Sequence, residues 1–136
     1  MFKEFGAPQE RKSAALGSGF IVDEKGIVIT NNHVIQDAED IIVRVNGDKE
    51  FKAQVIGADP LSDIAVLKLD SNEKFIPVKF GNSDKARIGD WVIAIGNPFG
   101  FGGTVTSGII SARNRSLGLT RYEDYIQTDA SINSGN

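Results

Sequence analysis

Residues 17–30 read Gly-Ser-Gly-Phe-Ile-Val-Asp-Glu-Lys-Gly-Ile-Val-Ile-Thr, and this stretch points to the fold class more directly than any other. Two runs rich in β-branched and aromatic residues, 17–23 and 26–30, flank the polar pair Glu24-Lys25. Runs of this kind on either side of a short polar turn are typical of a β-hairpin. The stretch therefore predicts two short antiparallel strands.

Similar patterns continue outward along the chain, with 15 glycines and 4 prolines spread between them. The further predicted strands are 41–45, 52–58, 64–69, 91–96, 104–112 and 125–128. Asn46-Gly47 follows the first of these, and Asn-Gly is a strong hairpin signal. The one helical candidate is a turn or two beginning near Asn32. Strands with frequent turns and no intervening helices favour an antiparallel barrel or sandwich, with the join between two such units in residues 71–90.

The composition excludes several classes of protein. A chain of 136 residues suits one domain, and 40% hydrophobic residues with a mean hydropathy of −0.15 are typical of a soluble globular chain. The net charge of −3 gives no electrostatic reason to expect a nucleic-acid partner. No apolar run approaches the ~18 residues of a membrane span, and no signal peptide is expected in this chain. With no cysteine and one histidine, neither a usual zinc site nor another cofactor is expected.

The single histidine and one acid are the candidate catalytic pair. His33 follows a β-branched strand, and Asp63 stands at the mouth of the apolar strand 64–69, where burying an unpaired charge would be costly. Each residue also has an ordinary structural interpretation. His33 would be a satisfied core or surface residue, and Asp63 would cap its loop or lie in water, as Asp59 nearby is expected to do. Neither residue is specific by itself.

Four motifs, taken together, are specific. They are Thr-Asn-Asn-His-Val-Ile at 30–35, Ser-Asp-Ile-Ala-Val-Leu-Lys-Leu at 62–69, Gly-Asn-Pro-Phe-Gly at 96–100 and Gln-Thr-Asp-Ala-Ser-Ile-Asn-x-Gly-Asn at 127–136. In this order the chain resembles the HtrA (DegP-like) serine proteases from about Leu16 to Asn136. The resemblance implies an all-β, chymotrypsin-like double β-barrel. The first barrel, residues 16–80, would be complete, and the second, residues 81–136, would be only partly present.

The resemblance also implies a Ser-His-Asp triad. His33 would be the general base, Asp63 would orient its imidazole, and the nucleophile would be a serine immediately after the last residue of this sequence. Backbone N–H groups of the turn before that serine would form the oxyanion hole. The residues of this region are Asn133, Ser134, Gly135 and Asn136. A chain without the nucleophile is expected to be inactive alone, because the serine hydroxyl is the attacking group.

Two further segments carry family expectations with open alternatives. The loop of residues 113–121 resembles the family's regulatory loop, in which Arg115 would relay activation to the oxyanion turn; the alternative is a solvated basic loop. Residues 1–15 would be an oligomerisation arm of a trimer, and the alternative is a disordered tail.

The function implied by the resemblance is a serine endopeptidase of protein quality control. It would degrade unfolded or misfolded polypeptides in the periplasm or cell envelope, with PDZ domains or a complementing C-terminal protease segment as partners. The alternative is a non-catalytic pseudoprotease, or chaperone-like binding subunit, that holds unfolded chains on exposed strand edges.

Overall fold

The computed structural model describes residues 16–45, 49–97, 103–118 and 123–132, and it is built almost entirely of β-strands. The elements are β1 (Gly19–Asp23), β2 (Ile27–Asn31), α1 (Asn32–Ile35), β3 (Ile41–Val45), β4 (Lys49–Asp59), β5 (Ile64–Leu69), the 3-10 turn Ser83–Lys85, β6 (Trp91–Gly96), β7 (Thr104–Arg115) and β8 (Tyr125–Thr128). The predicted all-β class is confirmed, and the short helix begins at Asn32 as expected. The Asn46-Gly47 turn lies outside the described residues.

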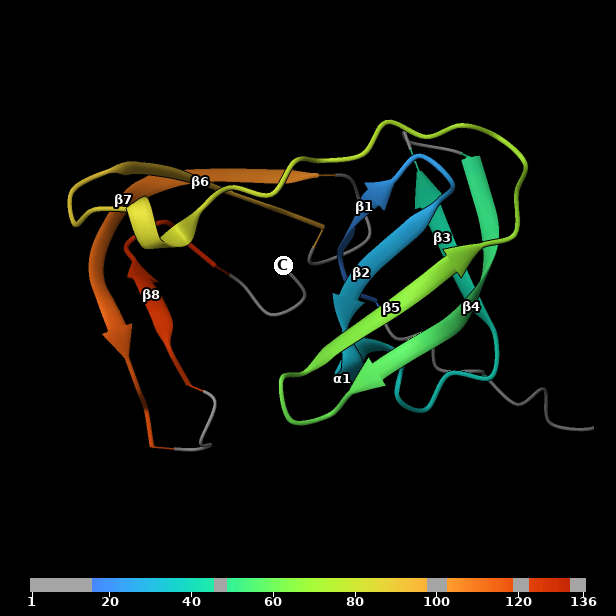
Figure 1. Cartoon of the computed structure of the whole chain (residues 1–136), viewed down its shortest axis with the longest axis horizontal. Helices are drawn as coiled ribbons and strands as arrows, with labels where there is room; N and C mark the ends of the chain where they lie inside the picture. Colours follow the sequence, from blue (N-terminus) through green and yellow to red (C-terminus); the bar gives the residue numbers. More distant parts are fainter. Residues whose placement is uncertain (1–15, 46–48, 98–102, 119–122, 133–136) are drawn as a thin grey trace, which may run out of the picture.

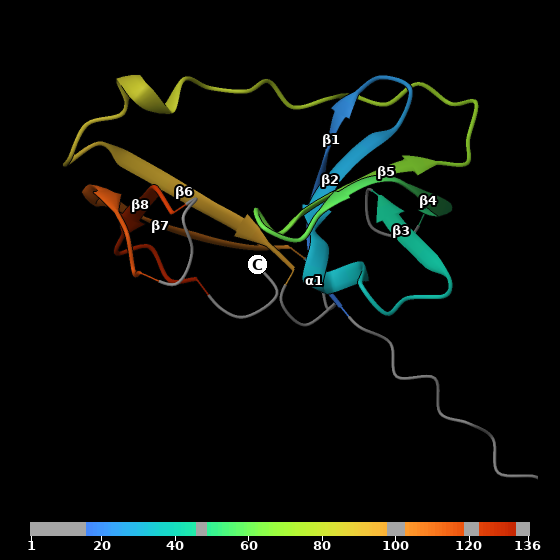
Figure 2. The same ribbon diagram turned by 60° about the horizontal axis from the view of Figure 1, so that its bottom comes forward.

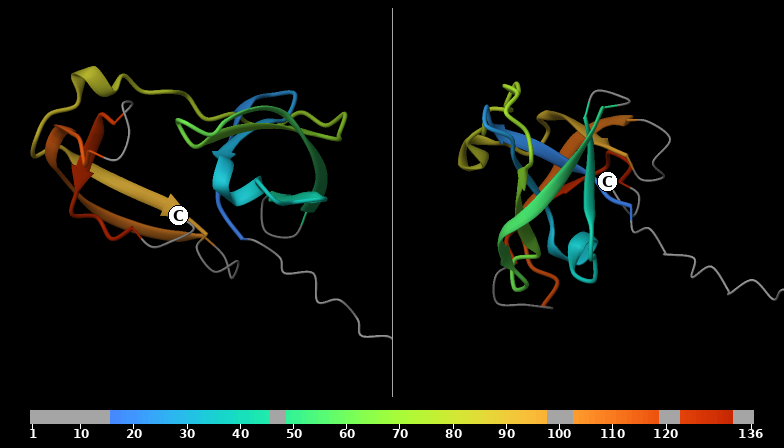
Figure 3. Two further views of the ribbon diagram at one scale, coloured as in Figure 1. Left: turned by 90° about the horizontal axis from the view of Figure 1, so that it is seen from below. Right: turned by 90° about the vertical axis from the view of Figure 1, so that its right-hand side faces the viewer.

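Five strands form the first sheet, in the order β1-β2-β5-β4-β3, and every neighbouring pair is antiparallel. The sheet curls strongly, so that its two edge strands turn toward each other (Figure 3). Ile56 has no partner in the register between β4 and β5, which makes a bulge in the longest strand of the sheet. Bulges increase local twist and bend, and this one contributes to the curvature.

The connecting segment, residues 70–90 between β5 and β6, extends the first sheet beyond β1. The Phe75 N–H donates to the Glu24 carbonyl (2.9 Å), and the Val78 N–H donates to the Ile21 carbonyl (2.8 Å). The free edge of β1 is therefore paired at Ile21, and the turn after β1 at Glu24, although these residues form no regular strand. The segment then crosses to the second sheet along the top of the molecule (Figure 1).

The core of the first sheet follows the alternation of inward and outward side chains along β5. Ala65, Leu67 and Leu69 point inward and are at most 2% exposed, whereas Ile64 on the opposite face is 43% exposed. Fully burying a leucine side chain stabilises a fold by about 1.5–3 kcal/mol. Partly buried side chains from the other strands and the connecting segment close around Val28, Leu67 and Leu69. They are Ile21, Ile41, Val43, Val45, Phe51, Ala53 and Phe75.

The second sheet has three antiparallel strands in the order β6-β7-β8, and it lies beside the first (Figure 2). Several hydrogen bonds tie it to the preceding residues, and two of them reach furthest back along the chain. The Asn97 N–H donates to Ser18 Oγ (2.7 Å), which joins the end of β6 to the start of the first sheet. Arg113 Nη2 donates to the Ser83 carbonyl (3.2 Å). Within the described ranges no helix is long and apolar enough to cross a bilayer.

Candidate active site

The pairing of β2 with β5 brings His33 and Asp63 together. Asn31 ends β2 opposite Ile64, which begins β5. His33 lies two residues beyond Asn31 in α1, and Asp63 lies one residue before Ile64, so both reach the same end of the central strands. In Figure 1, α1 lies at this end of β2, beside the start of β5. The strand register therefore brings together two residues that are 30 positions apart.

The carboxylate of Asp63 contacts His33 twice. His33 Nδ1 lies 2.6 Å from Asp63 Oδ2, and the His33 backbone N–H donates to Asp63 Oδ1 (2.8 Å). A carboxylate accepts hydrogen bonds only, so the Nδ1 position carries the proton in this contact. A neutral ring with its proton on Nδ1 has an unprotonated Nε2. This is the tautomer that a general base requires, because Nε2 can accept a proton from a hydroxyl group.

The electrostatics of the pair favour an ionised acid. Burial raises the pKa of Asp63, but the hydrogen bonds from the His33 backbone and ring, the electrostatic attraction to His33 and the hydrogen bond from the Asn32 backbone together outweigh it. The pKa of Asp63 therefore lies below its ordinary value of 3.8. Both side chains remain open to solvent, with 65% of His33 and 42% of Asp63 exposed. The ring is accordingly accessible to a reacting group.

The backbone at Asp63 is unusual. Its φ of 56° lies in the left-handed region, which Asp and Asn tolerate better than most residues. Its carbonyl accepts hydrogen bonds from the Asn32 N–H (3.0 Å) and from Asn31 Nδ2 (3.1 Å). The contact of Asn31 was not anticipated from the sequence. Its position one residue before the predicted helical turn would instead suggest a helix cap, and the side chain makes no capping hydrogen bond.

The two neighbouring aspartates have different tasks. Asp59 caps its own loop, because its carboxylate accepts hydrogen bonds from the Leu61 N–H (3.0 Å) and the Ser62 hydroxyl (2.7 Å). Asp63 instead points to His33. The ordinary interpretation from the sequence, loop capping, therefore holds for Asp59 and does not describe Asp63.

The segment that leads to the predicted oxyanion turn is held against β7. The Ile109 N–H donates to Asp129 Oδ1 (2.7 Å), and the Thr106 hydroxyl donates to the Ser131 carbonyl (2.7 Å). A Cβ added at Gly108 would lie 2.3 Å from the Ala130 nitrogen, so the absence of a side chain permits this close approach.

Not every predicted site residue joins the His33–Asp63 pair. Asn133, Ser134, Gly135 and Asn136 lie outside the described residues. Arg115 is the last residue of β7, is exposed, and stands opposite Tyr125 of β8. Its proposed relay role stays a prediction.

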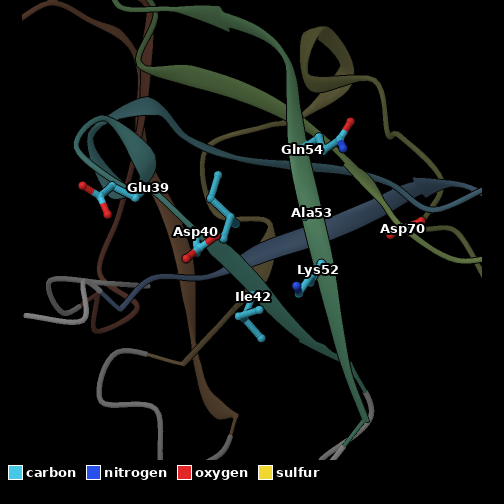
Figure 4. A pocket seen from close by; sticks show the side chains of 8 residues that line it. Glu39, Asp40, Ile42, Lys52, Ala53, Gln54 and Asp70 are labelled. Atoms are coloured by element: carbon cyan, nitrogen blue, oxygen red, sulfur yellow. The ribbon is translucent and has the colours of Figure 1, made fainter. Parts of the chain in front are cut away.

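A hollow beside β3 and β4 is separate from the pair (Figure 4). Its lining residues are Glu39, Asp40, Ile41, Ile42, Lys52, Ala53, Gln54 and Asp70. The carboxylates here do not assemble into a metal site, since no group of three or more His, Cys, Asp or Glu side chains in the described part of the chain is arranged to hold an ion.

Comparison with known proteins agrees with this geometry. Residues 17–136 match a family model described as a trypsin-like peptidase domain. A Brucella suis biovar 1 (strain 1330) protein named "Probable periplasmic serine endoprotease DegP-like" is 52% identical over 130 residues, which cover 95% of this chain and 25% of the relative. A protein of the same name from Pseudomonas fulva (strain 12-X) is 51% identical over 132 residues, which cover 96% of this chain and 27% of that relative. The chain thus spans about a quarter of the length of these relatives.

Solved structures show the same relationship. The HtrA-type protease AlgW with a decapeptide superposes with a TM-score of 0.81 at 52% sequence identity, covering 88% of this chain and 37% of that one. The same protease with a tripeptide gives a TM-score of 0.81 at 52% identity, and the match covers 88% of this chain and 40% of that one. The two sheets described above therefore have the arrangement found in these proteases.

Proposed function

The chain belongs to the trypsin-like peptidase family, with HtrA-type and DegP-like proteases as its relatives, and from that premise we propose that it forms part of a serine endopeptidase. The observation that carries the proposal is the His33–Asp63 contact, with Nδ1 on the carboxylate and an exposed ring. The domain boundary near residue 80 is part of the same proposal. This boundary falls in the connecting segment between the two sheets. The proposed N-terminal segment, residues 1–15, lies outside the described residues.

In the proposed mechanism, the nucleophile is a serine that follows Asn136 in the complete protein. His33 Nε2 removes the hydroxyl proton as the oxygen attacks the substrate carbonyl, and it later donates that proton to the departing amine. Asp63 holds the tautomer and stabilises the imidazolium. Water then repeats the attack on the acyl-enzyme with His33 again as the base. Backbone N–H groups around Asn133–Asn136 stabilise the oxyanion, each such donor contributing about 2.7–4 kcal/mol.

The substrates that we propose are unfolded or misfolded polypeptides, and the site of action is the periplasm or cell envelope. The support for the compartment is the name of the relatives, which are called periplasmic. The relatives are named endoproteases, which supports a polypeptide substrate here. A trimeric assembly, PDZ domains and the relay role of Arg115 are proposed on the family resemblance.

The test is made on the complete protein that contains this chain. We expect it to cleave casein and to react with a fluorophosphonate, and we expect His33→Ala to abolish both. Asp63→Asn keeps the size of the side chain and its tolerance of the left-handed region, so it should fold normally and lower kcat by about 10⁴-fold. Casein cleavage that survives His33→Ala would show that the proposed function is wrong.

The alternative function, a non-catalytic subunit that binds unfolded chains, is favoured by one observation. Large apolar side chains of β6 are exposed, namely Trp91, Ile93 and Ile95. Such a patch binds apolar segments of other chains. The two functions are separated by the fluorophosphonate reaction, because a binding subunit would suppress aggregation of an unfolded protein without becoming labelled.

A further inference from the structure

Asn31 occupies the N-cap position of α1 without acting as a cap. Its φ of −80° and ψ of 142° are those of an N-cap residue, yet its side chain makes no capping hydrogen bond. Asn is among the preferred N-cap residues because its side-chain oxygen accepts a backbone N–H of the first turn. The side chain of Asn31 is therefore used for another purpose.

Asp63 performs the capping task from across the sheet. The His33 N–H, which a capping side chain at Asn31 would reach, donates instead to Asp63 Oδ1 (2.8 Å). In return, Asn31 Nδ2 donates to the Asp63 carbonyl (3.1 Å). Only the NH₂ end of an amide can face a carbonyl oxygen, so the orientation of the Asn31 side chain is determined.

The hydrogen bonds between Asp63 and the residues at the start of α1 hold Asp63 in its left-handed conformation. The Asp63 carbonyl accepts two donors, Asn31 Nδ2 and the Asn32 N–H (3.0 Å). Two donors on one carbonyl fix the orientation of its peptide plane, and the Cα with its side chain follows that plane. The carboxylate can then present one oxygen to the His33 N–H and the other to Nδ1.

We propose that Asn31 is a positioning residue of the catalytic pair, which acts on His33 through the main chain of Asp63. The inference rests on the proposed function, since positioning matters for catalysis only if His33 is the base. Asn31 touches neither the ring nor the substrate in this mechanism. Its contribution is that Asp63 stays in the one backbone conformation from which both carboxylate oxygens reach His33.

Two substitutions in the complete protein separate positioning from helix capping. Asn31→Asp keeps the size and the capping ability of the side chain, but it removes the donor to the Asp63 carbonyl. Asn31→Ala removes the donor without adding a charge near His33. If Asn31 mattered only for the helix, Asn31→Asp would be neutral. We expect both variants to lower kcat by about 10- to 100-fold, as a small misplacement of catalytic groups does, with KM unchanged.

Asn82 provides the matched control. It is the N-cap of the 3-10 turn Ser83–Lys85, and there the side-chain oxygen does accept the Asp84 N–H (3.0 Å). Asn82→Asp is the same chemical change at a conventional cap. We expect it to leave kcat and KM as they are in the unchanged protein.

A spectroscopic measurement reports the position of the pair without turnover. The Nδ1 proton of His33 gives a strongly deshielded NMR resonance while it is held on the Asp63 carboxylate, and His33→Ala and Asp63→Asn identify it by its loss. In both Asn31 variants we expect this resonance to weaken or shift upfield, with the melting temperature little changed.

Three outcomes would overturn the inference. They are an unchanged kcat in either Asn31 variant, a kcat loss no larger than the loss of folded protein, and an equal loss in Asn82→Asp. Failure of the proposed function is recognised separately, because casein cleavage would then survive His33→Ala. In that case the Nδ1 resonance alone decides, and a resonance that is unchanged in both Asn31 variants would overturn the inference.

Discussion

Asp63 uses three oxygen atoms at once. Its two carboxylate oxygens contact the backbone and ring of His33, and its carbonyl oxygen accepts hydrogen bonds from Asn31 and Asn32. Because all of these contacts depend on a left-handed backbone, Asp and Asn are the side-chain-bearing residues best suited to this position. Substitution by alanine would therefore change the backbone together with the charge, whereas asparagine changes mainly the charge.

The depressed pKa of Asp63 predicts a dependence of stability on pH. A carboxyl group whose pKa is lower in the folded protein stabilises the fold above its unfolded pKa, and that stabilisation is lost as the pH falls through the folded pKa. We therefore expect the free energy of unfolding to fall below about pH 4, the ordinary range of an aspartate. In Asp63→Asn this contribution to the acid dependence should be absent.

The measurement is urea denaturation of the protein and of Asp63→Asn at a series of pH values from neutral to strongly acidic. The difference in the free energy of unfolding should narrow as the pH falls, because a protonated aspartic acid is neutral, as asparagine is. A difference that stays constant over the whole acid range would contradict the assignment of a lowered pKa to Asp63.

At the scale of elements, two strand pairings determine the geometry around the site. The pairing of β2 with β5 brings α1 to the loop before β5. The pairing of β7 with β8 carries the chain to Asp129 and Ala130, which then lie across Gly108. One pairing positions the base and its acid. The other positions the segment that precedes the predicted oxyanion turn.

Gly108→Ala tests the second pairing. The atoms that a Cβ would meet include the Ala130 backbone nitrogen and Cα at 2.3 and 2.8 Å, and a backbone cannot move aside as the end of a flexible side chain can. Introducing a group into a packed site costs about 1–3 kcal/mol. We expect this loss in the free energy of unfolding, and a lower kcat in the complete protein, because the segment before the oxyanion turn is displaced.

Gly57→Ala is the matched control in β4. A Cβ at this position has nothing within 4 Å, and the backbone is not in the left-handed region. A Gly→Ala change at a compatible position stabilises a protein by about 0.4–1 kcal/mol. If Gly108→Ala proved as harmless as Gly57→Ala in denaturation and in turnover, the close approach at Gly108 would have no structural importance.

At the scale of the whole molecule, the two sheets differ in how well they are covered. The first sheet has an interior in which Leu67 and Leu69 are almost fully buried. The second has a large apolar face in solvent, since Trp91, Ile93 and Ile95 alternate along β6 and are 66–81% exposed. Val105, which pairs with Ile95, is 64% exposed on the neighbouring strand.

This exposed face predicts self-association of the 136-residue polypeptide. Contiguous apolar patches of this kind promote association. We expect Ile93→Thr with Ile95→Thr to shift the polypeptide toward the monomer, because threonine retains strand propensity while adding a polar group. Sedimentation velocity measures the shift. Ile42→Thr on β3, where the side chain is 51% exposed, is the control and should leave association unchanged. Equal association of all three proteins would rule out this face as the contact.

Local patterns in the sequence were sufficient for the elements, whereas the His33–Asp63 pair was proposed from the family resemblance of four motifs taken together. The hairpin at Glu24-Lys25, the alternation of Ala65, Leu67 and Leu69 and the start of the helix at Asn32 follow from rules that act over a few residues. The boundaries were less accurate. β4 begins at Lys49 and β7 continues to Arg115, because pairing with a neighbouring strand prolongs a strand beyond its local signal.

The tertiary structure alone decided the atomic arrangement at the site. The distance between His33 and Asp63 depends on the register of two strands, and the left-handed backbone of Asp63 depends on donors supplied by Asn31 and Asn32. Neither is encoded in a local pattern, since the partners lie about 30 positions apart. The order of the motifs, through the family resemblance, therefore indicated which residues could react, and long-range strand pairing determined which atoms of those residues meet.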